Sequence, residues 1–179
     1  YDCVAIFANH TVIQPAQEKA LLDFVKAGGG LVPLHCASYC FLNSPAYIEL
    51  VGGQFLRHGT GVFRETLVDT NHPVLRGLNA IESWDETYVH TRHNTNRVVL
   101  SERRDGQGAE PYTWVRDFGQ GRVFYTAWGH DQRTWSNTNF HGLVENGIRW
   151  ASAHAPNAVR PVAGLKPLET IEAPAPLPN

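Results

Sequence analysis

Apolar runs and amphipathic stretches alternate along the first part of the chain. Residues 3–8 (CVAIFA) have the apolar character of a buried strand. Residues 15–26 predict a helix, because proline suits its first position and apolar residues then recur at helical spacing. Glycines at 28–30 end this helix, and the apolar run 31–34 is too short for anything but a central strand. The order strand, helix, strand predicts a βαβ unit with two parallel strands.

The second part of the chain predicts a hairpin and a closing helix. The apolar arms 112–117 and 122–126 flank Phe-Gly-Gln-Gly at 118–121, which is a strong signal for an antiparallel hairpin. A last helix begins at Asn137 or Thr138, where a polar side chain can cap its first turn. Other patterns predict a short helix over 44–51 and extended segments over 61–68, 81–90 and 98–101. Residues 127–135 predict a polar loop.

Histidines occupy the polar turns that follow several of these elements. His10 and His35 follow the two parallel strands, so they share the sheet edge where ligands bind in open α/β sheets. His58 follows a helix that ends in glycines, and His130 lies in the loop after the hairpin. If these turns converge, the imidazoles suit a divalent metal or acid–base chemistry, although no HExxH motif is present. The remaining histidines suit structural or solvated roles: His72, His90, His93, His141 and His154.

Two aromatic-rich segments suit the binding of a sugar. Strand alternation places Glu86 on one face with Trp84 and Tyr88, where rings can pack on C–H groups while the carboxylate takes hydroxyls or a proton. An ordinary exposed strand is the alternative interpretation. The loop after the hairpin carries Gly-His-Asp-Gln-Arg between two tryptophans, and such a loop is costly to build merely as a connection. From these segments we expect five substrate-binding residues: Trp84, Tyr88, Trp128, Asp131 and Arg133.

Cys36 offers a different chemistry. A cysteine at a junction of strand and turn, with His35 or His130 as base, is the arrangement of a nucleophile. The sharp turn of a nucleophile elbow needs a small residue two positions earlier, and Leu34 does not meet that requirement. The alternative is a small buried thiol that packs behind the turn. The three cysteines form no disulfide framework and no CxxC motif.

Composition limits the classes of function. A length of 179 residues with 42% hydrophobic and 18% charged residues is typical of one globular domain. A net charge of −2 predicts no electrostatic attraction to nucleic acid or to an anionic membrane. No signal peptide or membrane-spanning run is present, and localisation and oligomeric state stay open. We expect a domain over 1–154 and a proline-rich linker or surface arm over 155–179.

Several motifs together resemble the trehalose-utilisation, or ThuA-like, family. They cover nearly all of residues 1–154 in the family's order: GGGLVPLH at 28–35, YIELVGGQFLRH at 47–58, NHPVLRGL at 71–78, WDETY at 84–88, GQGRVFYTAWGHDQRTW at 119–135 and FHGLVENGIRWA at 140–151. The resemblance implies a three-layer α/β sandwich, flavodoxin-like or class I glutamine amidotransferase-like, with an antiparallel hairpin extension. It also implies a link to bacterial sugar catabolism.

The resemblance also implies which residues form the site. The family's recurring polar positions correspond to His35, His58, Glu86 and His130, with Asp85, Tyr88 and Asp131 beside them. Members usually begin with a further strand and a histidine-containing loop. This chain opens directly into a strand pattern, so we expect an upstream strand and helix to be absent and the pocket to lack whatever that loop contributes. The proline-rich tail resembles the junction to further domains in multidomain relatives.

We therefore expect a sugar-processing domain that acts on a glycoside or a 3-keto-sugar of the trehalose type. His35, Glu86 and His130 are the expected catalytic residues, and His35, His58 and His130 are the expected ligands if a divalent metal such as zinc is bound. One alternative is a non-catalytic carbohydrate-binding or scaffold module of a larger protein. The other is a Cys36-dependent, amidotransferase-like hydrolase.

Overall fold

The first 33 residues fold as the βαβ unit that the sequence predicts. β1 (Cys3–Ile6) runs parallel to β2 (Gly30–Pro33), with Cys3 opposite Gly30. The connection between them contains α1 (Pro15–Lys26), which begins with proline in its first turn. Both strands therefore point their carboxyl ends toward the same rim of the sheet.

The predicted hairpin joins this unit to the rest of a mixed sheet. The computed structural model describes residues 1–106 and 108–153, and its main sheet has six strands in the order β1-β2-β10-β9-β8-β5. β10 (Gly121–Thr126) is parallel to β2 and antiparallel to β9 (Gly108–Phe118), and β8 (Val98–Asp105) and β5 (Thr66–Leu67) continue the antiparallel side. A Cβ at Gly121 would lie 2.0 Å from the Val25 carbonyl oxygen, so the hairpin packs against α1 only with glycine there.

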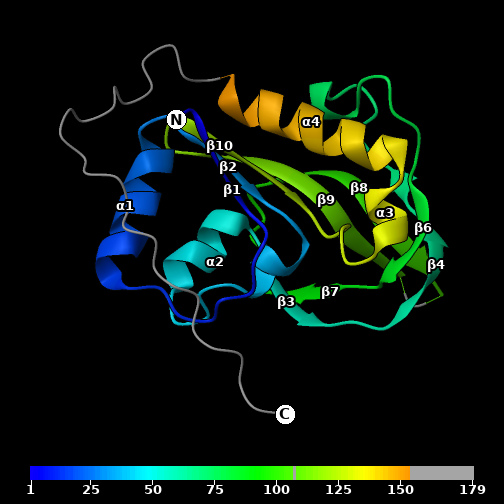
Figure 1. Cartoon of the computed structure of the whole chain (residues 1–179), viewed down its shortest axis with the longest axis horizontal. Coiled ribbons are helices and arrows are strands. Elements are labelled where there is room, and N and C mark those ends of the chain that lie inside the picture. Colours follow the sequence, from blue (N-terminus) through cyan, green and yellow to red (C-terminus); the bar gives the residue numbers. More distant parts are fainter. Residues whose placement is uncertain (107, 154–179) are drawn as a thin grey trace.

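Helices cover both faces of this sheet, as Figure 1 shows. α4 (Thr138–Ser152) lies across one face, and α1 and α2 (Pro45–Val51) lie on the other. Asn137 caps α4, because its side chain accepts the backbone N–H of Asn139. The helix packs closely because Gly147 rests on the Phe124 ring, where a Cβ would approach to 2.3 Å. The three-layer α/β architecture that the sequence predicts is confirmed.

Shorter elements lie beyond the carboxyl ends of the parallel strands. β3 (Gln54–Arg57) pairs with β7 (Val89–Thr91), and β4 (Thr60–Arg64) pairs with β6 (Glu82–Glu86), each as an antiparallel ladder. Two 3₁₀ helices and a short α-helix complete the described part of the chain: η1 (His35–Tyr39), η2 (Pro73–Leu75) and α3 (Gln132–Trp135). The last of these lies inside the segment predicted as a loop.

The single strand predicted over 81–90 is wrong. The chain leaves β6 after Glu86, where the Tyr88 N–H donates to the Glu86 carbonyl oxygen and the Thr87 N–H donates to Gly59. This turn starts a second strand, β7, with a different partner. The segment predicted as extended over 61–68 is likewise divided between β4 and β5.

The described residues belong to the expected domain over 1–154, and the expected proline-rich arm at 155–179 lies outside them. Within the described part of the chain, no helix combines the length and the apolar character that crossing a bilayer requires.

Candidate active site

Neighbouring strands end at one rim of the sheet, and the residues that follow them line a shared cavity of about 340 Å³. β1 leads into Phe7 and Asn9, β2 leads into His35 at the start of η1, and β10 leads into the loop that carries His130. The polar lining consists of Asn9, His35, Cys36, His58, Glu86 and His130. The aromatic lining consists of Phe7, Tyr39, Phe55 and Tyr88. His10, which was expected at this edge, is exposed and is not part of the lining.

His35 is buried in a single orientation. Its backbone has φ 47°, a left-handed conformation that a residue with a side chain rarely adopts. Nδ1 lies 2.7 Å from the carbonyl oxygen of Ala127, which only accepts, so Nδ1 carries the proton and Nε2 bears a lone pair. The Tyr88 hydroxyl donates to this lone pair over 3.1 Å. Burial lowers the pKa of His35 although Asp85 and Glu86 lie near, which favours the neutral ring.

The carboxylate of Glu86 is the meeting point of three imidazoles. Its oxygens lie 3.3 Å from His35 Nε2, 3.4 Å from His58 Nε2 and 3.2 Å from His130 Nδ1. His58 Nδ1 lies 3.1 Å from the Gly59 carbonyl oxygen, so it too carries its proton on Nδ1 when neutral. Neither Nε2 atom therefore carries a proton to donate to Glu86, and the lone pair of His35 Nε2 already accepts the Tyr88 hydroxyl. These nitrogen and oxygen atoms attract one another only when a cation, either a proton or a metal ion, lies between them.

Asp85, the neighbour of Glu86, holds the loop that carries His130. Its side chain is fully buried and accepts the backbone N–H groups of Gly129 and His130 over 3.1 and 3.2 Å. It also accepts the hydroxyl of Thr134 over 2.6 Å. The carboxylate thus fixes both ends of the turn that places His130 against Glu86. Sequence reasoning put Asp85 beside the site without assigning it this role.

The expected substrate-binding residues divide into two groups. Tyr88 lines the cavity, but the other four are absent from its lining. Trp84 stacks on the guanidinium of Arg133, whose carbon lies 4.2 Å from the ring centre. Arg133 also bonds to the carboxylate of Asp131 and holds the pKa of that carboxyl at about 2. Trp128 is 0% exposed and donates its indole N–H to Glu65, so it supports the site from the core.

Aromatic residues that sequence reasoning missed form the walls of the cavity. Phe7 is 53% exposed and Tyr39 is 39% exposed, which is a large exposure for rings of this size. Tyr39 packs edge-on against Phe55 with ring centres 5.5 Å apart, and Phe55 packs on Tyr88 at 4.5 Å. Phe7 and Tyr39 follow the two parallel strands, so their positions at the carboxyl edge are the signal that could have identified them.

Cys36 also faces the cavity, but its surroundings do not activate it. Burial raises the pKa of the Cys36 thiol, and the charge of Glu86 raises it further. The sulfur is therefore protonated at neutral pH, whereas a cysteine nucleophile reacts as the thiolate. Cys40, four residues later, is buried and free and donates its S–H to the Ala8 carbonyl oxygen. These observations weigh against the nucleophile interpretation.

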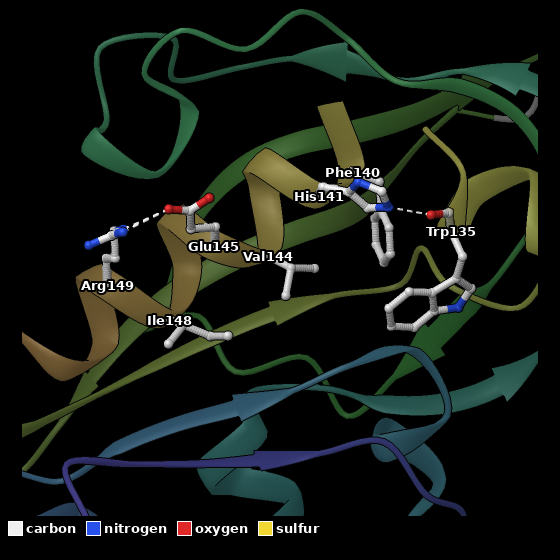
Figure 2. Close-up of a pocket in the computed structure, with 7 residues that line it drawn as sticks. All are labelled: Trp135, Phe140, His141, Val144, Glu145, Ile148 and Arg149. Carbon is white, nitrogen blue, oxygen red and sulfur yellow. Dashed lines mark hydrogen bonds and ion pairs between the residues drawn. The ribbon is translucent and has the colours of Figure 1, made fainter. Parts of the chain in front are cut away.

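A second hollow, of about 520 Å³, runs along α4 and is shown in Figure 2. Its surface is mainly apolar, with side chains of Trp135, Phe140, Val144 and Ile148. Its polar groups are engaged with one another or with the backbone: His141 contacts the Trp135 carbonyl oxygen, and Arg149 bonds to Glu145 over 2.8 Å. By contrast, a carboxylate and three imidazoles converge in the first cavity, which we take as the candidate active site.

Comparisons with known proteins agree on family and fold. The family model described as "Trehalose utilisation", ThuA, matches residues 1–151. A ThuA-like protein from Parabacteroides merdae superposes with a TM-score of 0.75 at 23% identity, covering 85% of this chain and 70% of that one. A ThuA-like protein from Bacteroides uniformis superposes with a TM-score of 0.72 at 21% identity, covering 84% of this chain and 69% of that one. A β-galactosidase from Rahnella sp. R3 gives 0.60 at 20%, covering 86% of this chain and 23% of that one. No curated protein matches.

Proposed function

Because this chain belongs to the trehalose utilisation family, ThuA, we propose that it is a sugar-processing domain acting on a glycoside or a 3-keto-sugar of the trehalose type. One observation carries the proposal. Ligand atoms of His35, Glu86 and His130 all lie within 4.8 Å of one another. They do so in a cavity whose walls include the exposed rings of Phe7 and Tyr39, which suit the C–H faces of a sugar.

The donor set fits a divalent cation such as zinc. Two imidazoles and one carboxylate are a common set of zinc ligands. His35 already donates Nδ1–H to the Ala127 carbonyl oxygen, which is the second contact that a metal-bound histidine usually makes. Glu86 takes the place of the expected ligand His58 among the three residues whose ligand atoms converge. His58 contacts only Glu86 among these residues, over 3.4 Å. When bound, the cation would polarise a substrate oxygen and lower the pKa of a water molecule at the site.

The residues of the chain supply the positioning and the proton transfer. Phe7, Tyr39 and Phe55 hold a sugar ring above the polar floor of the cavity. Glu86 carries a proton to or from the substrate at Oε1, within 3.2 Å of His130 Nδ1. The side chain of His130 is 47% exposed, so it can exchange this proton with solvent. Without a cation, Tyr88 orients the His35 ring by donating its hydroxyl to Nε2, the atom that would bind the cation.

Turnover of 3-keto-trehalose by the purified chain tests this proposal. We expect Glu86→Gln to lower the turnover number by at least about 100-fold, since the amide cannot carry the proton. Glu82→Gln is the matched control, because Glu82 lies on the same strand but is exposed and contacts Arg64. Turnover that survives in Glu86→Gln would contradict the role of Glu86. Sugar binding without any turnover would favour the non-catalytic module instead.

A further inference from the structure

A second cluster of ionisable groups lies beneath the active site. His90, in β7, has a side chain that is 0% exposed. Its Nδ1 lies 2.9 Å from Oε1 of Glu110, and the same oxygen accepts the His90 backbone N–H over 3.0 Å. Its Nε2 lies 3.0 Å from the hydroxyl of Tyr125. These three residues line up from β9 through β7 to β10, and none of them lines the cavity.

The chain of contacts ends on the backbone of His35. The Tyr125 hydroxyl lies 3.1 Å from the His35 carbonyl oxygen and 2.9 Å from Ser38 Oγ, both in η1. Ser38 Oγ lies 3.2 Å from the same carbonyl oxygen. The His35 ring is therefore held at Ala127, and its carbonyl oxygen lies against the hydroxyls of Tyr125 and Ser38.

Such a hold is needed because of the backbone of His35. A non-glycine residue at φ 47° is strained and persists only where its surroundings enforce it. Without the contacts to η1, this turn could relax and the His35 ring would turn away from Glu86.

The donors and acceptors of the cluster fix one pattern. The Glu110 carboxylate only accepts, so the proton of neutral His90 lies on Nδ1. His90 Nε2 then accepts the Tyr125 hydroxyl proton, so the Tyr125 oxygen is free to accept the hydroxyl of Ser38, whose Oγ lies 2.9 Å away in η1. Each of these protons thus has one acceptor, in the order Ser38, Tyr125, His90, Glu110. Glu110 at the far end is partly exposed, whereas the hydrogen bonds of the buried members hold a single geometry.

We propose that Glu110, His90 and Tyr125 are positioning residues that hold η1 and thereby aim the His35 ring at Glu86. This inference rests on the proposed function only in taking His35 as an active-site group. It predicts that substitutions of these three residues change the orientation of the His35 ring although none of the three lines the cavity. The cluster differs from a purely structural core because its end point is the strained residue itself.

Two tyrosine variants form a matched pair for the test. Tyr125→Phe removes the hydroxyl beneath His35 and keeps the ring, which packs on Trp114 with centres 4.2 Å apart. Tyr47→Phe is the control, because the buried Tyr47 hydroxyl donates to the Ala37 carbonyl oxygen of the same turn over 3.0 Å. The readout is the ¹⁵N spectrum of the His35 imidazole at one fixed pH in metal-free protein, which reports the position of its proton.

We expect Tyr125→Phe to convert the single Nδ1–H form of His35 into a mixture of tautomers, whereas Tyr47→Phe leaves it unchanged. The turnover number should fall by about 10- to 100-fold in Tyr125→Phe, with KM little changed. Should Tyr125→Phe fail to fold, Glu110→Gln perturbs the same chain from its far end. An unaltered His35 spectrum in a folded variant of either residue would overturn the proposal. Because the spectrum needs neither metal nor sugar, it stays decisive even if wild-type turnover is absent.

Discussion

Two clusters in this molecule combine histidine with glutamate, yet they are built in opposite ways. In the buried cluster, Glu110 accepts two N–H groups of His90, and His90 accepts the hydroxyl of Tyr125. In the cavity, Glu86 faces the Nε2 atoms of His35 and His58, whose protons lie on Nδ1. In the first cluster donors meet acceptors, whereas in the second the Nε2 acceptors of His35 and His58 lie beside an acceptor carboxylate. The difference supports a structural role for the first cluster and is the physical basis of the cation proposed for the second.

The largest difference should appear when each glutamate is replaced by glutamine. Glu110→Gln loses a charge-assisted acceptor of two N–H groups, so we expect the free energy of unfolding to fall by about 1–3 kcal/mol. In metal-free protein, Glu86→Gln should change it by less than about 0.5 kcal/mol, because the amide N–H can donate to an imidazole Nε2. Urea denaturation with a chelator present measures both values.

Equal destabilisation by the two substitutions would contradict the comparison. It would mean that the hydrogen bonds of Glu86 are already satisfied in the metal-free protein, as those of Glu110 are. The case for a cation at Glu86 would then lose its physical basis.

A smaller effect should appear in the pH dependence of stability. Burial lowers the pKa of His90 in the folded protein although Glu110 opposes the shift. Below pH 6.5, the ordinary pKa of histidine being about 6.5, the unfolded chain therefore binds a proton at His90 that the folded chain does not bind. Stability should be complete above this pH and should fall as the pH drops from 7 to 5.5, by at most about 1.4 kcal/mol per pH unit for one group. Burial lowers the pKa of His35 too, which adds to the slope.

Thermal unfolding of His90→Gln measures the contribution of the buried cluster. This variant should lose less stability than wild type over the same pH range, because it lacks the side chain that binds a proton only in the unfolded state. His10→Gln is the control, because His10 is exposed and lies outside the cluster. An unchanged slope in His90→Gln would show that His90 is not the group responsible.

The sequence was sufficient for much of the fold. The helix at Pro15–Lys26 and the hairpin at 118–121 follow from local signals, and both are present. The strand predicted over 81–90 was wrong, because the turn after Glu86 depends on a distant contact with Gly59. Alternation along a single strand had placed Trp84 and Glu86 on one face. The break after Glu86 removes that argument for Tyr88 only; Trp84 shares β6 with Glu86 but lies on Arg133 rather than in the cavity lining.

The site was predictable where it depends on sheet topology. His35 and His130 follow neighbouring parallel strands, and their ring centres lie 5.6 Å apart. His58 and Glu86 were candidates from their local patterns, and the family resemblance implied the same two positions. The buried cluster was not predictable, because its partners lie 20 and 35 residues apart and each contact depends on how distant strands pair. Trp128 was misjudged for a similar reason, since burial is a property of the folded core.

The most direct test of a cation at Glu86 is metal analysis of the purified chain after dialysis against zinc, combined with anomalous diffraction from its crystals. We predict one ion for each chain, placed among His35, Glu86 and His130, and loss of that ion in His35→Ala and Glu86→Gln but not in His93→Gln. A wild-type chain that retains no ion, or an ion that persists in both site variants, would contradict the account.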